Sequence, residues 1–194
     1  MDNDRKMEKR AKPLKQTSES LNANAAVVVL FRAAGQDFNV LLVKRAENPT
    51  DKWSGQTAFP GGKRDPEDTD IKATVVRETL EETSINLLED CRFLGTMEPL
   101  SSVEKPEMKI LPFIVMQEKE QAIKLNHELT EYFWTPLKEL DSHNRTTKLS
   151  LGVFPAYKIG KHVIWGLTYN ILHNLLSLLS DIEKEELKEN NFCY

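Results

Sequence analysis

Three glutamates on one predicted helix are the residues of this chain best suited to carry out chemistry. Glu78, Glu81 and Glu82 fall within five residues of each other. On a helix, the i, i+3 and i, i+4 spacings bring their carboxylates to one side. They also lie near the C-terminal end of that helix, where the helix dipole disfavours anions. A hard divalent cation such as Mg²⁺ or Mn²⁺ turns each of these repulsions into an attraction. The spacing therefore predicts a metal site.

The segment before the glutamates predicts how they are positioned. Gly61 and Gly62 follow a proline and indicate a tight turn, and the acidic stretch 65–70 opens the helix. Asp68 or Thr69 is expected to be its N-cap, because side-chain oxygens there accept from the first free backbone N–H groups. An apolar stripe is expected to face the core on the side away from Glu78 and Glu82, and it consists of Ala73, Val76 and Leu80.

The rest of the chain alternates short apolar runs with turn residues. Runs rich in β-branched residues predict strands, and glycine-containing turns between two such runs predict hairpins. Strands are expected at 25–31, 38–44, 57–59, 91–97, 109–116, 131–135, 157–159 and 162–165. A short helical turn is expected at 136–140 and a helix at 168–180, with Leu172, Leu175, Leu176 and Leu179 facing a core.

Composition favours one compact domain in a reducing compartment. The 194 residues are 40% hydrophobic and 29% charged, and the net charge of -4 gives no reason to expect nucleic acid as a partner. Two distant cysteines do not indicate a disulfide framework, and acidic residues interrupt the basic N-terminus, so we expect the cytoplasm. Asn170, His173 and Asn174 break the longest apolar stretch near the C-terminus, so we expect no membrane span. The expected organisation is a flexible arm at 1–23, a domain at 24–180 and a charged tail at 181–194.

The segment from Phe59 to Ile85 resembles the Nudix box, the loop–helix–loop of the Nudix hydrolases. Its Arg-Glu-apolar-x-Glu-Glu-x-Gly-apolar ending is matched by Arg77, Glu78, Glu81, Glu82 and Ile85. The resemblance implies an α/β/α sandwich with a central mixed β-sheet.

Several positions depart from the common box, and some of the departures indicate a branch of the family. Ser84 replaces the closing glycine, and the spacing from Gly62 to Arg77 is one residue longer than usual, so Glu67 and Asp68 compete for the place of an upstream acid. The longer spacing and the segments 54–68 and 164–168 look like the coenzyme A pyrophosphatase branch. The basic, histidine-containing segment that usually precedes Ser-Gly-Gln in that branch is absent from 49–53.

The resemblance implies roles for the box residues. Glu78 and Glu82 are implied as direct metal ligands, with Glu81 as a ligand or a close partner of one. The backbone carbonyl of Gly62 is implied as a further ligand. Arg77 is expected to pair with a box glutamate and hold it in place, the alternative being a simple surface ion pair.

The general base and the substrate contacts are less sharply indicated. Some family members use a box glutamate as the base, and others use a carboxylate from a later loop. Glu128 is the leading candidate of the second kind, and Glu104 and Glu107 are weaker ones. Lys44 and Arg45 end a strand that is expected to point toward the cleft, where cations suit phosphate groups. Gly61 and Gly62 are also expected to contact the substrate.

The resemblance implies a metal-dependent pyrophosphohydrolase acting on a nucleoside diphosphate linked to another moiety. Coenzyme A or an acyl derivative is the first substrate expected, and ADP-ribose or a dinucleotide is the alternative. A non-catalytic nucleotide-binding module on the same fold is a second hypothesis, although such modules usually lose box glutamates, and all three are present here. Dimerisation is frequent in the family, so a homodimer is an open expectation.

Overall fold

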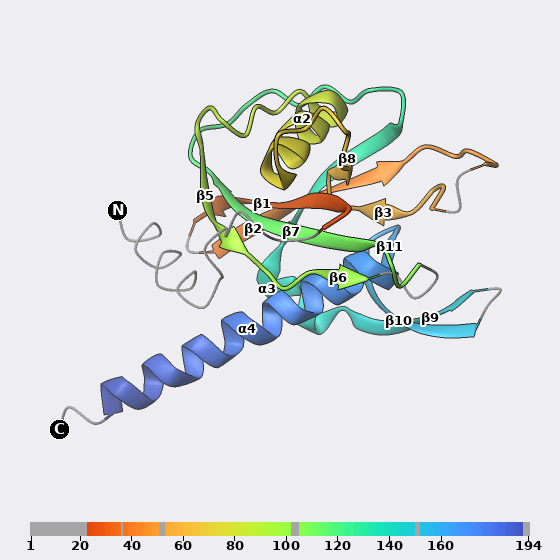
Figure 1. Ribbon diagram of the computed structural model, residues 1–194. Coiled ribbons are helices and arrows are strands. Elements are labelled where there is room, and N and C mark those ends of the chain that lie inside the picture. The colour runs from red at the N-terminus through yellow and green to blue at the C-terminus, as the bar shows by residue number, and fades with distance from the viewer. Residues whose placement is uncertain (1–22, 36, 51–52, 102–104, 150–151, 192–194) are drawn as a thin grey trace.

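The computed structural model of the protein describes residues 23–35, 37–50, 53–101, 105–149 and 152–191 (Figure 1). Two sheets and three helices make up these ranges. The predicted N-terminal arm therefore lies almost wholly outside the described residues, and the predicted boundary at residue 180 falls inside the last helix. No helix in the described ranges is both long enough and apolar enough to span a membrane.

The main sheet is mixed and has eight strands. Its path runs β3-β2-β1-β7-β5, while β4 pairs with β1, β6 with β7, and β8 with β2. The pairing of β1 with β7 is parallel, and the others are antiparallel. The strands are β1 (Ala25–Ala34), β2 (Asp37–Arg45), β3 (Thr57–Ala58), β4 (Gly61–Lys63), β5 (Cys91–Thr96), β6 (Leu100–Ser101), β7 (Lys109–Gln117) and β8 (Leu129–Pro136).

Helices cover both faces of this sheet (Figure 1). Helix α2 (Ile71–Thr83) lies on one face, and α3 (Leu137–Ser142) and α4 (Gly166–Asn191) lie on the other. A three-stranded antiparallel sheet of β9 (Asn144–Leu149), β10 (Gly152–Ile159) and β11 (His162–Trp165) joins the α4 side. This layering confirms the predicted α/β sandwich with a central mixed sheet.

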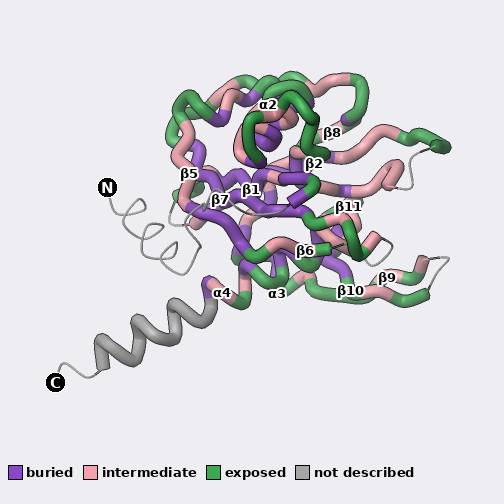
Figure 2. Tube along the Cα trace, in the orientation of Figure 1, coloured by how far each residue is buried: buried purple, intermediate pink, exposed green. Residues whose placement is uncertain are grey.

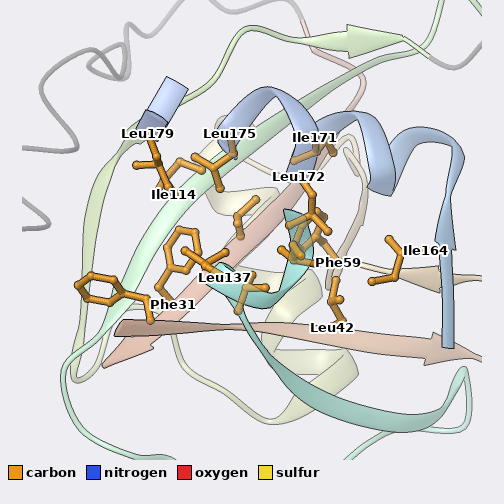
Figure 3. Close-up of a cluster of buried hydrophobic side chains, with 14 of the residues drawn as sticks. Phe31, Leu42, Phe59, Ile114, Leu137, Ile164, Ile171, Leu172, Leu175 and Leu179 are labelled. Carbon is orange, nitrogen blue, oxygen red and sulfur yellow. The ribbon is translucent and has the colours of Figure 1, made fainter. Parts of the chain in front are cut away.

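Each face of the sheet has its own apolar core, because successive strand residues point to opposite faces. On the α4 side, Ile171, Leu172, Leu175 and Leu179 point toward sheet side chains such as Leu42 and Ile114 (Figure 3). The leucine stripe predicted for the last helix is confirmed. A second cluster lies under α2, and the central strands β1 and β7 are buried along most of their length (Figure 2).

Two predictions for helix α2 are wrong. The N-cap is Asp70, not Asp68 or Thr69, since the Asp70 Oδ1 accepts from the Ala73 backbone N–H at 2.7 Å. The buried face is also different, because Leu80 is 45% exposed while Thr74, Val75 and Thr79 are fully buried. The buried face carries threonines as well as apolar residues, so the spacing of the apolar residues alone indicated the wrong side.

Sequence reasoning found most of the strands and missed the more polar ones. Strand β9 was missed because Asn144–Leu149 is polar and mostly exposed, and its place is fixed by its pairing with β10. Strand β4 was read only as a turn, although Gly61 and Gly62 pair with Val27 and Ala26 of β1. That pairing is what holds the glycines against α2.

Candidate active site

Helix α2 is fixed at both ends and lies against strands β1 and β4. Asp70 caps its start, and Ser84 ends it in the left-handed conformation, with φ of 62° and its N–H donating to the Leu80 carbonyl at 2.9 Å. The loop before β8 also binds this end, since the Asn126 N–H donates to the Glu82 carbonyl at 3.1 Å. The glutamates therefore stand on a helix that has little freedom to shift.

The two glycines of β4 allow the helix to approach the sheet closely. The Gly61 N–H donates to the Glu82 Oε2 at 2.8 Å. A Cβ on Gly61 would lie 2.2 Å from the Ala26 carbonyl oxygen, and its φ of +138° also favours glycine. A Cβ on Gly62 would lie 2.5 Å from the Glu78 carboxylate. Gly61 therefore requires glycine because of the sheet backbone, whereas a side chain at Gly62 would have to displace the Glu78 carboxylate.

Arg77 links three acidic side chains. Its Nε and Nη2 each donate to Asp68 at 2.9 Å, and its Nη1 lies 3.0 Å from Glu78 and 3.4 Å from Glu81. The hydrogen bonds from Arg77 hold the pKa of the Asp68 carboxyl well below its usual range, and the bond to Asp68 likewise raises the pKa of Arg77. The predicted pairing of Arg77 with box glutamates is confirmed.

The contact with Arg77 also distinguishes Asp68 from Glu67, the two candidates for the upstream acid of the box. The Asp68 side chain is 6% exposed and accepts both parallel bonds from Arg77. Glu67 is exposed on the loop before α2. Asp68 is therefore the acid that anchors Arg77, a pairing of residues nine positions apart that depends on the path of this loop.

Glu82 is the most perturbed acid of the helix. Burial raises the pKa of Glu82 to about 7 against the opposing effect of the Gly61 N–H, and repulsion from Glu78 and Glu128 adds to the rise. Burial also raises the pKa of Glu78, although Arg77 counteracts it, with Glu81 and Glu128 contributing further repulsion. The structure thus brings Glu128 into the electrostatic field of both box glutamates.

The two cations at the end of β2 are on opposite faces of the sheet. Arg45 attracts the charged form of Glu82, as its place on the α2 side requires. Lys44 instead acts on Glu131 and His162, which belong to the α4 side. Successive residues of a strand point in opposite directions, so only one of the pair can face the glutamates. Glu107 is exposed between β6 and β7, and Glu104 lies outside the described residues.

The acids are gathered, yet they do not already surround one point. Among the described residues, no group of three His, Cys, Asp or Glu side chains is arranged so that it could hold a metal ion. Glu78 and Glu81 turn toward Arg77, and Glu82 toward Gly61. The donor set nevertheless suits a hard cation, because its carboxylates repel one another and two of them are partly or fully desolvated.

Comparison with known proteins agrees with this geometry. A family model described as the NUDIX domain matches residues 21–156. The human mitochondrial coenzyme A diphosphatase NUDT8 is 30% identical over 166 residues, which cover 81% of this chain and 70% of that protein. An uncharacterized Nudix hydrolase, NudL of Photorhabdus laumondii, is 32% identical over 173 residues, covering 84% of this chain and 88% of the relative.

Solved structures share the fold at low sequence identity. A MutT/nudix family protein from Enterococcus faecalis superposes with a TM-score of 0.54 at 17% identity, over 86% of this chain and 66% of that one. The Nudix hydrolase RenU from M. smegmatis superposes with a TM-score of 0.51 at 20% identity, over 68% and 83% of the two chains. These similarities concern the arrangement of helices and strands.

Proposed function

The chain belongs to the Nudix family and is a pyrophosphohydrolase, and we propose that it cleaves the diphosphate of coenzyme A or an acyl-coenzyme A with Mg²⁺ or Mn²⁺. The observation that carries the proposal is the pair Glu78 and Glu82 against the glycines of β4, with Glu128 near enough to raise the pKa of both. Support for the substrate comes from the relative named as a coenzyme A diphosphatase and from the segments 54–68 and 164–168.

Metal dependence is part of this proposal. Glu78 and Glu82 would hold the cation, with Glu81 as a further ligand or as a partner kept in place by Arg77, and with the Gly62 carbonyl beside them. The ion supplies neutralisation of the diphosphate charge and activation of the attacking water. The Glu78 carboxylate lies so close to Gly62 that a Cβ there would come within 2.5 Å of it, which supports a ligand set built from that carboxylate and the adjacent backbone.

The residues of the chain perform the remaining tasks. Arg77, anchored by Asp68, positions Glu78 and Glu81. Glu128 would accept the proton of the attacking water, and a box glutamate is the alternative base. Arg45 would bind a phosphate on the α2 side, whereas Lys44, which acts on Glu131 and His162 of the other face, is not proposed as a contact to that phosphate.

The bond changes follow from attack of water on one phosphorus. The water oxygen bonds to that phosphorus, the bond from the phosphorus to the bridging oxygen breaks, and the bridging oxygen leaves with the second phosphate. Coenzyme A then gives a phosphopantetheine and an adenosine bisphosphate. ADP-ribose and dinucleotides contain the same linkage, so the alternative substrates differ only in the groups attached to it.

A substrate panel with product masses tests the proposal. Coenzyme A, an acyl-coenzyme A, ADP-ribose and a dinucleotide are incubated with Mg²⁺ or Mn²⁺, using the wild type and the Glu82→Gln, Glu128→Gln and Glu89→Gln variants. We expect coenzyme A to turn over fastest, with large losses for the first two variants. Glu89→Gln is the matched control, since this exposed residue lies beyond the end of α2.

Two outcomes would contradict the proposal. Turnover that is unchanged in Glu82→Gln would remove the box glutamates from catalysis, and no turnover of any compound with either metal would favour the non-catalytic binding module. Faster cleavage of ADP-ribose than of coenzyme A would keep the reaction and replace the substrate.

Location, assembly and domain limits also stay proposals. We propose the cytoplasm, because two cysteines far apart in the sequence suit a reducing compartment, although one relative is named mitochondrial. Cell fractionation checks this. We also propose a homodimer, which analytical ultracentrifugation checks, and a catalytic domain spanning 24–180, which limited proteolysis checks.

A further inference from the structure

The loop that carries Glu128 joins β7 to β8 and runs past helix α2 (Figure 1). Two backbone hydrogen bonds attach it to the end of that helix. The Lys124 N–H donates to the Thr83 carbonyl at 2.9 Å, and the Asn126 N–H donates to the Glu82 carbonyl at 3.1 Å. The loop is therefore fixed to the same helical turn that presents the last box glutamate.

The side chain of Asn126 binds the backbone of Glu128. Its Oδ1 accepts from the Glu128 N–H at 2.9 Å. A bond from a side-chain oxygen to the N–H two residues further on forms an Asx turn, which asparagine favours. The backbone bond across the same turn, from the Leu129 N–H to the Asn126 carbonyl, is longer at 3.4 Å. The Asn126 side chain is therefore the shorter and stronger restraint on this turn.

The end of strand β2 holds Glu128 from the other side. The Ala46 N–H donates to the Glu128 carbonyl at 2.7 Å. Glu128 is exposed, so packing against the core does not fix its place. Its position depends instead on the two backbone bonds, one accepted by Asn126 and one donated by Ala46.

Asn126 thus connects a box glutamate directly to the candidate base. Its backbone binds the Glu82 carbonyl, and its side chain binds the Glu128 N–H. The Glu128 carboxylate lies close enough to repel Glu78 and Glu82. A general base must lie within hydrogen-bond reach of the water it deprotonates, and a misplacement of about 1 Å can cost about a hundredfold in rate. The restraint on this turn therefore bears on catalysis.

We infer that Asn126 is a positioning residue, whose side-chain oxygen holds Glu128 where its carboxylate accepts the proton of the attacking water. Asn126 acts through Glu128 rather than on the substrate. The catalytic part of this inference rests on the proposed function of Glu128, whereas the restraint on the Glu128 backbone does not.

Steady-state kinetics of two Asn126 variants test the inference, using Mg²⁺ and the panel compound that turns over fastest. Asn126→Ala should lower kcat about tenfold and change KM by less than about twofold, because the groups that bind the diphosphate are unchanged. Asn126→Ser should exceed the kcat of Asn126→Ala by about threefold or more, since its hydroxyl can accept the same bond more weakly. A purely structural role would lower thermal stability without this division between kcat and KM.

A double variant tests whether Asn126 acts through Glu128. Glu128→Gln alone should lower kcat about a hundredfold or more. Adding Asn126→Ala to it should lower kcat by no more than about twofold further, because the group that Asn126 positions is already lost. A further loss as large as that of the single Asn126→Ala variant would show independent action and overturn the inference.

Asn86→Ala is the matched control. Asn86 forms the same kind of turn in the loop after α2, where its Oδ1 accepts from the Leu88 N–H at 3.0 Å. Its kcat and KM should equal those of the wild type. An equal loss of kcat in Asn86→Ala and Asn126→Ala, or an unchanged kcat in Asn126→Ala, overturns the inference.

Amide hydrogen exchange at Glu128, measured by NMR in EDTA, provides a test without turnover. Asn126→Ala should speed this exchange about fivefold or more, and Asn86→Ala should leave it unchanged. Unchanged exchange in Asn126→Ala overturns the inference even if no diphosphate is hydrolysed and the proposed reaction fails. Full turnover in Glu128→Gln removes the proposed base and the positioning role with it. If Glu128→Gln loses turnover while Asn126→Ala keeps it, only the positioning role fails.

Discussion

Replacing Glu82 with glutamine should have opposite effects on stability and on activity. The Glu82 side chain is buried, and its pKa is raised from 4.5 to about 7. At about 1.4 kcal/mol for each tenfold change in proton affinity, keeping this carboxylate ionised in the folded state costs about 3 kcal/mol. Glutamine has no charge to desolvate, and its carbonyl can still accept from Gly61.

The sign of the pH dependence follows from the direction of this shift. Because the pKa of Glu82 is higher in the folded than in the unfolded protein, ionising it destabilises the fold as pH rises from about 4.5 to 7. The cost is complete above that window and small below it. Glu82→Gln should therefore raise the free energy of unfolding by about 2 kcal/mol at pH 8 and by under about 1 kcal/mol at pH 5. The gain at pH 8 is less than the full cost because the new amide N–H₂ needs a partner.

Urea denaturation in EDTA at both pH values measures these changes, with free energies of unfolding obtained by linear extrapolation. Glu81→Gln is the matched control on the same helix, and it should change stability by less than about 0.5 kcal/mol because that side chain is 55% exposed. Added Mn²⁺ should stabilise the wild type more than Glu82→Gln, since only the wild type keeps the carboxylate ligand. The reasoning would be refuted if Glu82→Gln were less stable than the wild type at pH 8. It would also be refuted if the gain in stability were as large at pH 5 as at pH 8.

Other substitutions around the helix should separate folding from catalysis. Arg77→Met should lower the free energy of unfolding by about 3 kcal/mol at pH 7, because it leaves the buried Asp68 carboxylate unpaired. Urea denaturation should show that this loss shrinks below about pH 4, where Asp68 becomes protonated in the unfolded state. Equal losses at pH 7 and pH 3.5 would contradict this. Gly61→Ala should destabilise by at least about 2 kcal/mol through its clash with the β1 backbone, whereas Gly62→Ala should fold and lose about tenfold or more in turnover, because its Cβ displaces Glu78. Thermal unfolding and rate measurements on both variants check the pair, and equal stability losses would count against the distinction.

The sequence was sufficient for the elements with strong local patterns. The hairpin of β1 and β2 and the hairpin of β10 and β11 were foreseen because apolar runs flank a glycine turn. The box was foreseen because its glutamates are close in the chain. These features depend on residues within about ten positions, which is the range over which periodicity and turn chemistry act.

What escaped sequence reasoning depends on contacts between distant segments. Asp68 was an ambiguous acid until the loop path brought it against Arg77. Lys44 and Arg45 were treated as one pair, although the strand sends them to opposite faces. The recess lined by Arg32, Gln117 and Trp134 is formed by three strands and a loop that Gln121 fixes, so nothing in one stretch of residues indicates it.

The contrast between Asp68 and Glu82 supports the proposed position of the cation. Both are acids with little exposure, yet Asp68 has a guanidinium to neutralise it and stays ionised, while Glu82 has only a backbone N–H and the more distant charge of Arg45. Arg77 also satisfies part of Glu78 and Glu81, and none of its bonds reaches Glu82. The uncompensated negative charge therefore lies between Glu78, Glu82 and Glu128, on the side of the helix that faces Gly61 and Gly62. A divalent ion entering there would relieve the repulsion that the protein's own cations leave in place, which supports the proposed metal position over one at the Asp68 end.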